Sequence, residues 1–113
     1  MAVVNEYKMY GATSTAAEGP ITLLSPGVNE TIIVKSLHVT NKSGGNTPTI
    51  TITNNGFEVI NTQTLVAAES VEILSNPMVV EGGTVLSYTT VGTVTDGVDI
   101  TISYLNIRKE TID

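Results

Sequence analysis

The residues suited to acid–base or nucleophilic chemistry are few and scattered. His38 is the only histidine of the chain, and there is no cysteine. Nucleophilic catalysis needs a base beside a nucleophile and a third group that orients the base. The sequence holds no G-x-S-x-G turn and no second histidine. We therefore expect His38 to be a structural or surface residue, and we predict no catalytic residue.

The acidic residues do not form a recognisable metal site either. None of the eleven Asp and Glu residues falls in the D-x-D-x-D-G pattern of a calcium loop. Asp96 and Asp99 flank Gly97, but Asp-Gly is a common hairpin connection, so we interpret this segment as a turn. A glycosidase would need two carboxylates across a cleft, which spacing in the sequence does not test. The glycines at 44–45 lack the spacing of a phosphate-binding loop. We predict no metal and no cofactor.

The composition predicts an all-β domain. Thr, Val and Ile account for 18, 14 and 11 of the 113 residues, and β-branched side chains suit a pleated sheet better than a helix. No stretch keeps the apolar spacing of an amphipathic helix. A chain of this length corresponds to one domain. We expect residues 1–113 to form a single antiparallel β-sandwich or jelly roll of about eight strands.

The charge of the chain limits its classes of partner. Only five residues are Lys or Arg, and the formal net charge is −6. A protein that follows nucleic-acid phosphates needs a basic stripe, so we expect no nucleic-acid binding. No apolar run of about 18 residues is present, so we expect no membrane span. The first residues lack the apolar centre of a secretory signal.

Turn residues divide the chain into short strands. Strict alternation in residues 49–53, followed by Asn54-Asn55-Gly56, predicts a hairpin. Gly82-Gly83 and Asp96-Gly97 predict further turns. The expected strands are residues 2–10, 21–24, 31–40, 49–53, 57–60, 70–74, 78–80, 84–90 and 98–107, with a loop at 11–20 and a polar tail at 108–113.

Regular alternation within these strands indicates which side chains form the core. In residues 31–40 it places Ile33, Leu37 and Val39 on one face of the strand. Ile32, Val34 and His38 lie on the other face. The expected core residues are Ile33, Leu37, Val39, Ile50, Ile52, Val71, Ile73, Leu86, Ile100 and Ile102.

Residues 2–10 carry apolar side chains on both faces of an extended strand. Such a strand is poorly satisfied as a solvent-exposed edge. Two interpretations follow: an arm that pairs with a neighbouring subunit or lies on a partner's surface, or the first strand of the chain's own sandwich. The candidate interface residues are Val3, Tyr7 and Met9 on one face, and Val4 and Tyr10 on the other.

Two segments resemble elements of a known family. Residues 27–41 (GVNETIIVKSLHVTN) combine a turn, an aliphatic run and a K-S-x-x-V-x-N strand. Residues 67–74 precede residues 77–86 (PMVVEGGTVL), which are similar to a "pLvLeaGDtL" element, although Gly83 stands where the family has Asp. From Gly27 to Ile107 the chain thus resembles the small β-sandwich virion proteins of tailed bacteriophages.

This resemblance implies a non-enzymatic virion structural protein. The expected type is a capsid decoration (cement) protein on the capsid surface that binds the major capsid protein or another virion protein. It also implies a homo-oligomer, either a trimer or a dimer. The alternatives are a neck or tail component and a receptor- or carbohydrate-binding β-sandwich module. Sugar-binding surfaces usually present aromatic side chains, and this chain has four Tyr, one Phe and no Trp.

Overall fold

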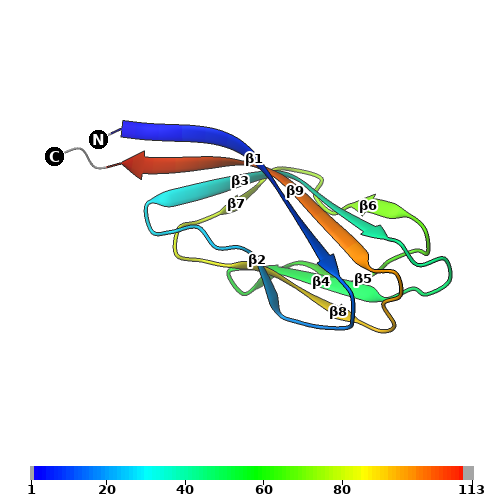
Figure 1. Ribbon diagram of the computed structural model, residues 1–113. Helices are drawn as coiled ribbons and strands as arrows, with labels where there is room; N and C mark the ends of the chain where they lie inside the picture. The colour runs from blue at the N-terminus through cyan, green and yellow to red at the C-terminus, as the bar shows by residue number, and fades with distance from the viewer. Residues whose placement is uncertain (1, 111–113) are drawn as a thin grey trace.

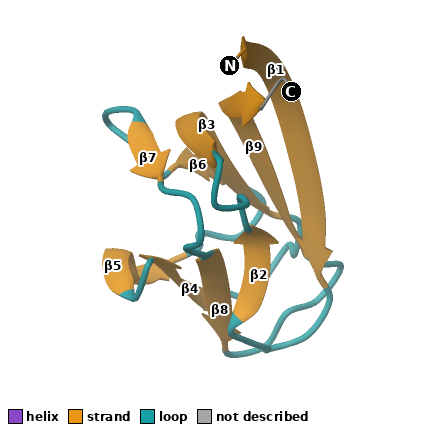
Figure 2. Cartoon of the chain, turned by 90° about the vertical axis from the view of Figure 1, so that its left-hand side faces the viewer, coloured by secondary structure: helices purple, strands orange, loops and turns teal. Residues whose placement is uncertain are grey.

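The computed structural model describes residues 2–110, which form two antiparallel β-sheets packed face to face (Figures 1 and 2). No helix occurs among these residues. The predicted all-β sandwich is therefore confirmed, with nine strands. They are β1 (Ala2–Ser14), β2 (Ile21–Leu24), β3 (Glu30–Asn41), β4 (Thr49–Asn54), β5 (Phe57–Thr64), β6 (Ser70–Glu72), β7 (Met78–Val80), β8 (Leu86–Val91) and β9 (Val98–Glu110).

The two sheets differ in length. The long sheet has the order β1-β9-β3-β6, with β7 also paired to β3. The short sheet has the order β2-β8-β4-β5. β6 and β7 share one edge of β3, β7 along its first half and β6 along its second. β1 forms the opposite edge of the long sheet and pairs with β9 over all 13 of its residues.

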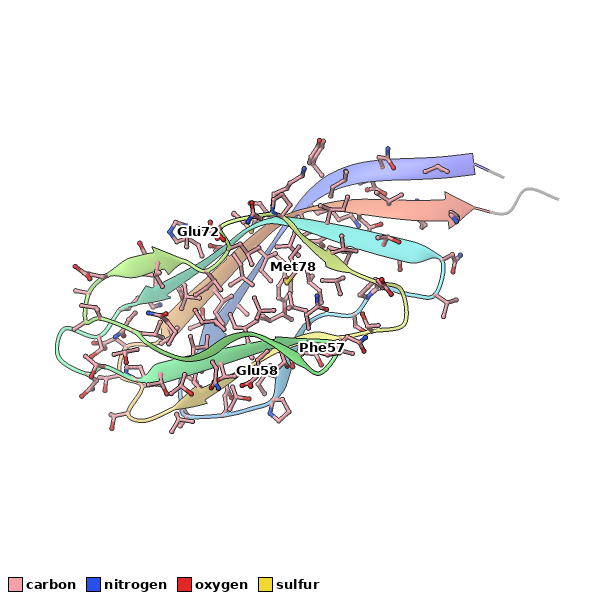
Figure 3. All side chains as sticks on the ribbon, turned by 180° about the vertical axis from the view of Figure 1, so that it is seen from behind. Phe57, Glu58, Glu72 and Met78 are labelled. Atoms are coloured by element: carbon pink, nitrogen blue, oxygen red, sulfur yellow. The ribbon has the colours of Figure 1, made fainter. Side chains whose placement is uncertain are left out.

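The core lies between the two sheets. Seven of the expected core residues are buried there, and Val71 and Ile73 pack against it while partly exposed. Met78 also packs against this core, and Figure 3 shows it between the sheets. The fully buried core residues that the sequence predicted are Leu37, Val39, Ile50, Ile52, Leu86, Ile100 and Ile102.

The prediction for Ile33 was wrong because β3 contains a bulge. The register of β3 against β9 shifts between Val34 and Ser36, which leaves Lys35 as an extra residue. An extra residue reverses which alternate side chains face inward. Val34 and Leu37 are therefore both fully buried, whereas Ile33 is partly exposed. Ile33 lies on the outer face of the long sheet.

The N-terminal segment is the first strand of the chain's own sheet. Residues 11–14 continue β1 because each pairs with β9, so the loop predicted at 11–20 is confined to 15–20. β9 in turn continues to Glu110, with Arg108 opposite Val4. The polar tail predicted at 108–113 was thus wrong for residues 108–110, which the long partner strand holds in the sheet. Residues 111–113 lie outside the described residues.

The predicted turns occur where the sequence places them. Asn55 and Gly56 have φ of 53° and 80° and connect β4 to β5, as expected for an Asn-Gly hairpin. Gly82 allows a close approach of two loops, because a Cβ atom there would lie 2.5 Å from the carbonyl oxygen of Gly27. The 25–29 connection therefore lies directly against the turn at Gly82.

Candidate interaction surface

The long sheet extends beyond the short sheet at the end that carries both termini (Figure 1). The molecule is accordingly elongated, measuring 56 × 23 × 22 Å along its principal axes. We call this part the projecting end, and the rest of the sandwich the body. The projecting end consists of residues 2–9 of β1, 103–110 of β9, 30–34 of β3 and β7.

A row of apolar side chains crosses the outer face of the projecting end. Tyr7 lies opposite Leu105, Leu105 opposite Ile33, and Ile33 opposite Val79. Residues directly opposite one another in antiparallel strands share a face and contact each other. Tyr7 is 79% exposed and Val79 is 50% exposed. Four strands therefore contribute to one continuous apolar row.

Neighbouring positions widen this row into a patch. Met9 and Val3, on the same face of β1, are 71% and 58% exposed, and Ile107 on β9 is partly exposed. Contiguous exposed apolar surface marks interaction sites, whereas single exposed apolar residues are ordinary. We call this surface the outer apolar patch, and its members are Val3, Tyr7, Met9, Ile33, Val79, Leu105 and Ile107.

The five candidate interface residues divide between the two faces of β1. Val3, Tyr7 and Met9 belong to the outer apolar patch, as their spacing indicated. Val4 and Tyr10 lie on the inner face, opposite Arg108 and Ile102; Val4 is partly exposed and Tyr10 is exposed. The sequence prediction missed the other four patch residues.

Polar side chains hold the inner face of the projecting end together. A salt bridge joins Glu6 Oε1 to Arg108 Nη1 at 3.2 Å. The Asn106 side-chain amide donates to Glu30 Oε2 at 3.1 Å, and the Gly27 N–H donates to Glu30 Oε1 at 3.0 Å. These two hydrogen bonds favour the ionised carboxylate and lower the pKa of Glu30 below its ordinary value.

The body differs from the projecting end in having polar side chains on its outer face. His38 is exposed there, opposite Thr101 on β9 and Glu72 on β6. Glu72 Oε2 accepts hydrogen bonds from the backbone N–H groups of Leu37 at 2.7 Å and Leu74 at 3.2 Å. The Glu72 carboxylate thus fixes the β3–β6 edge, and His38 is a surface residue, as expected.

Asp99 marks the far end of the same outer face. Its Oδ1 accepts a hydrogen bond from the Thr13 hydroxyl at 2.7 Å and lies 3.2 Å from Lys42 Nζ. Both contacts favour the charged form and lower the pKa of Asp99. Asp99 therefore ties β1, β9 and the loop after β3 together. Among residues 2–110 no group of three or more His, Cys, Asp or Glu could hold a metal ion.

A groove of about 320 Å³ lies beside the β4–β5 hairpin. Phe57, which is 76% exposed, stands at this hairpin with Glu58 (Figure 3). The groove joins an aromatic ring to amides and carboxylates, and Val79 connects it to the outer apolar patch. Its lining residues are Asn54, Asn55, Phe57, Glu58, Val59, Val79, Glu81 and Thr84.

Comparison with known proteins does not assign the chain to a family. No protein-family model matches the chain, and a search of curated proteins finds no significant match. Within the described part of the chain, no helix is long and apolar enough to cross a membrane.

Proposed function

We propose that this chain is a non-enzymatic structural protein of a bacteriophage virion and that it decorates the capsid. In this proposal the outer apolar patch attaches it to the major capsid protein or to another virion protein. The patch itself carries the proposal. Apolar side chains from four strands stay exposed on a sheet whose remaining outer face is polar. Covering such a patch with a partner removes apolar surface from water and stabilises the assembly.

The charge of the chain favours a protein as the partner. The net charge is −6, with only five basic residues. An anionic lipid surface or a nucleic acid attracts basic clusters instead. Lys109 is the only basic residue directly opposite a member of the patch on the outer face, across from Val3. An apolar surface on another protein therefore suits this patch best.

The choice of a virion as the assembly is supported by the resemblance of residues 27–107 to small phage virion proteins. It is compatible with the way the molecule is built: a closed sandwich forms the body, and its attachment surface sits on rigid strands. Rigid secondary structure holds an interface more precisely than loops do.

The experiment measures the copy number and the location of the chain in purified particles of the phage that encodes it. Quantitative mass spectrometry measures its copy number per particle, and immunogold labelling shows where it lies. The proposal expects hundreds of copies distributed over the capsid. A few to some dozens of copies at one vertex would favour the neck or tail, and absence from the particles would contradict a virion role.

A carbohydrate-binding module is the second candidate, because Phe57 presents an exposed ring above a groove of amides and carboxylates. Sugars stack on such rings and accept or donate hydrogen bonds at such polar groups. A glycan array with the wild type and Phe57→Ala tests this function. Glycan binding that is lost in Phe57→Ala would support it, and no binding by the wild type would remove it.

A further inference from the structure

The outer edge of β1 is an unused strand edge. β1 pairs only with β9 among the strands of residues 2–110. It runs for 13 residues without a proline, and its register against β9 contains no bulge. Proteins usually blunt an edge of this kind with a proline, a bulge or a charged side chain, because unpaired N–H and C=O groups recruit another strand.

In residues 2–10 the only features that could discourage pairing with another strand are two charged side chains on the inner face. Glu6 and Lys8 are two positions apart, so they lie on the same face of the strand. A lysine alone would discourage pairing with another strand. The adjacent glutamate changes this, because it makes the segment complementary to an antiparallel copy of itself.

We infer that β1 pairs with β1 of a second copy of this chain, antiparallel, about a two-fold axis that passes beside Tyr7. Only this register places Glu6 of each copy opposite Lys8 of the other. Moving the axis by one residue would set Glu6 against Glu6 or Lys8 against Lys8. Opposite charges directly across a ladder stabilise it, and like charges destabilise it.

The other positions in this register are also compatible. Val4 lies opposite Tyr10 of the second copy; in one copy alone Val4 is partly exposed and Tyr10 is exposed. Because the strands run antiparallel, the two bodies point toward opposite ends of the joined sheet. The arrangement is an isologous two-fold contact, the commonest form of homodimer.

This pairing would join the two outer apolar patches into one surface. A two-fold axis perpendicular to the sheet keeps the outer faces of both copies on the same side, with Tyr7 beside Tyr7. The inference does not depend on the proposed virion function, because it rests on the edge of β1 and on charges of the inner face.

Charge exchange tests the register. At micromolar concentration the wild type should sediment at twice the 11.9 kDa of one chain. Glu6→Lys and Lys8→Glu should each be monomeric, because each sets like charges opposite one another. Mixing these two variants should restore a dimer. Lys35→Glu, which makes the same change at the exposed bulge of β3, should dimerise like the wild type.

Single cysteine substitutions give a second test. It does not depend on the folding of Glu6→Lys, a variant that also loses the salt bridge to Arg108. The chain has no native cysteine. Tyr7→Cys should form an intermolecular disulfide on oxidation, because directly opposite Cα atoms lie about 4.5–5.5 Å apart. Asn5→Cys should not cross-link to itself, since the two copies of this position would be about 14 Å apart. It should cross-link when mixed with Met9→Cys.

Three results would overturn the inference. The first is a monomeric or trimeric wild type. The second is a dimer that persists in both folded charge variants. The third is disulfide formation by Tyr7→Cys that is no faster than by Asn5→Cys alone. A Lys8→Glu variant that is monomeric and still binds particles would show that attachment does not need the dimer. The dimer inference would then be judged on the wild type alone, separately from the proposed attachment.

Discussion

The body and the projecting end share the same three long strands and differ in the polarity of their outer faces. In the body, Ile100, Ile102 and Leu37 face inward and are fully buried, while Thr101 and His38 face outward. The short sheet covers the inner face there. An apolar face turned toward a second sheet is the ordinary arrangement of a β-sandwich.

In the projecting end apolar side chains face outward as well as inward. Its inner face combines the buried side chains of Ile32, Val34 and Val80 with two polar pairs, Glu30 with Asn106 and Glu6 with Arg108. The short sheet does not extend over the outermost parts of β1 and β9, next to the termini (Figure 1). Folding of one chain therefore explains the inner faces of both regions, whereas the exposed apolar side chains on the outer face of the projecting end are what the proposed attachment to a partner would cover. This difference is the main reason for assigning the attachment surface there.

The largest expected effect is the difference in stability loss between a leucine of the body and a leucine of the projecting end. Leu37→Ala should lower the free energy of unfolding by about 2–5 kcal/mol, because it empties fully buried core volume. Leu105→Ala should cost about 1 kcal/mol or less, because its side chain stays partly exposed in the free protein. Urea denaturation followed by circular dichroism measures both. Equal losses would mean that Leu105 contributes to folding as much as a core leucine does.

Removal of residues 1–8 should have a smaller effect. Most side chains of β1 at these positions are exposed, whereas Ser14, at its far end, is fully buried. The truncated chain should stay folded, with a loss of about 1–2 kcal/mol, because little buried apolar area is removed. It should also lose particle binding. Thermal unfolding gives the stability, and outright unfolding of the truncated chain would show that the body depends on the projecting end.

The smallest effect concerns pH, and here the two regions should behave alike. The pKa values of Glu30 in the projecting end and Asp99 in the body are both lowered by their hydrogen bonds. A lowered carboxyl pKa adds stability above the ordinary value, about 4.3 for Glu and 3.9 for Asp. That stability is lost as the pH falls through the folded-state value.

Glu30→Gln and Asp99→Asn should each flatten the decline of the unfolding free energy between pH 5 and pH 2, a range set by about one to two units around these ordinary values. Urea titrations at several pH values measure this slope. A slope that matches the wild type in both variants would show that neither carboxylate carries the acid sensitivity.

The sequence predicted the body better than the projecting end. Strict alternation in residues 49–53 and 98–102 identified Ile50, Ile52, Ile100 and Ile102 as core residues, and the Asn-Gly pair identified the hairpin. Alternation also separated Val3, Tyr7 and Met9 from Val4 and Tyr10. It did not reveal the bulge at Lys35, because an extra residue is set by pairing with β9 and has no distinctive residue type.

The patch residues of β9 had a signal in the sequence. Residues 98–104 keep apolar side chains at even positions, and the apolar positions then change to Leu105 and Ile107. Such a change within one uninterrupted strand indicates that its apolar side chains pass to the other face. Ile33 and Val79 could not be assigned in this way, since their place in the patch depends on the bulge and on the pairing of β7 with β3.

Attachment through the outer apolar patch is tested most directly by sedimentation of the purified protein with capsids that lack it. Leu105→Ser/Ile107→Ser changes the patch and leaves the edge of β1 unaltered. Val66→Ser/Val91→Ser is the matched control, because these valines are 54% and 62% exposed and lie outside the patch. With both variants folded, we expect the control and the wild type to sediment with the capsids and Leu105→Ser/Ile107→Ser to stay in the supernatant. Equal sedimentation of the two double variants would contradict attachment through this patch.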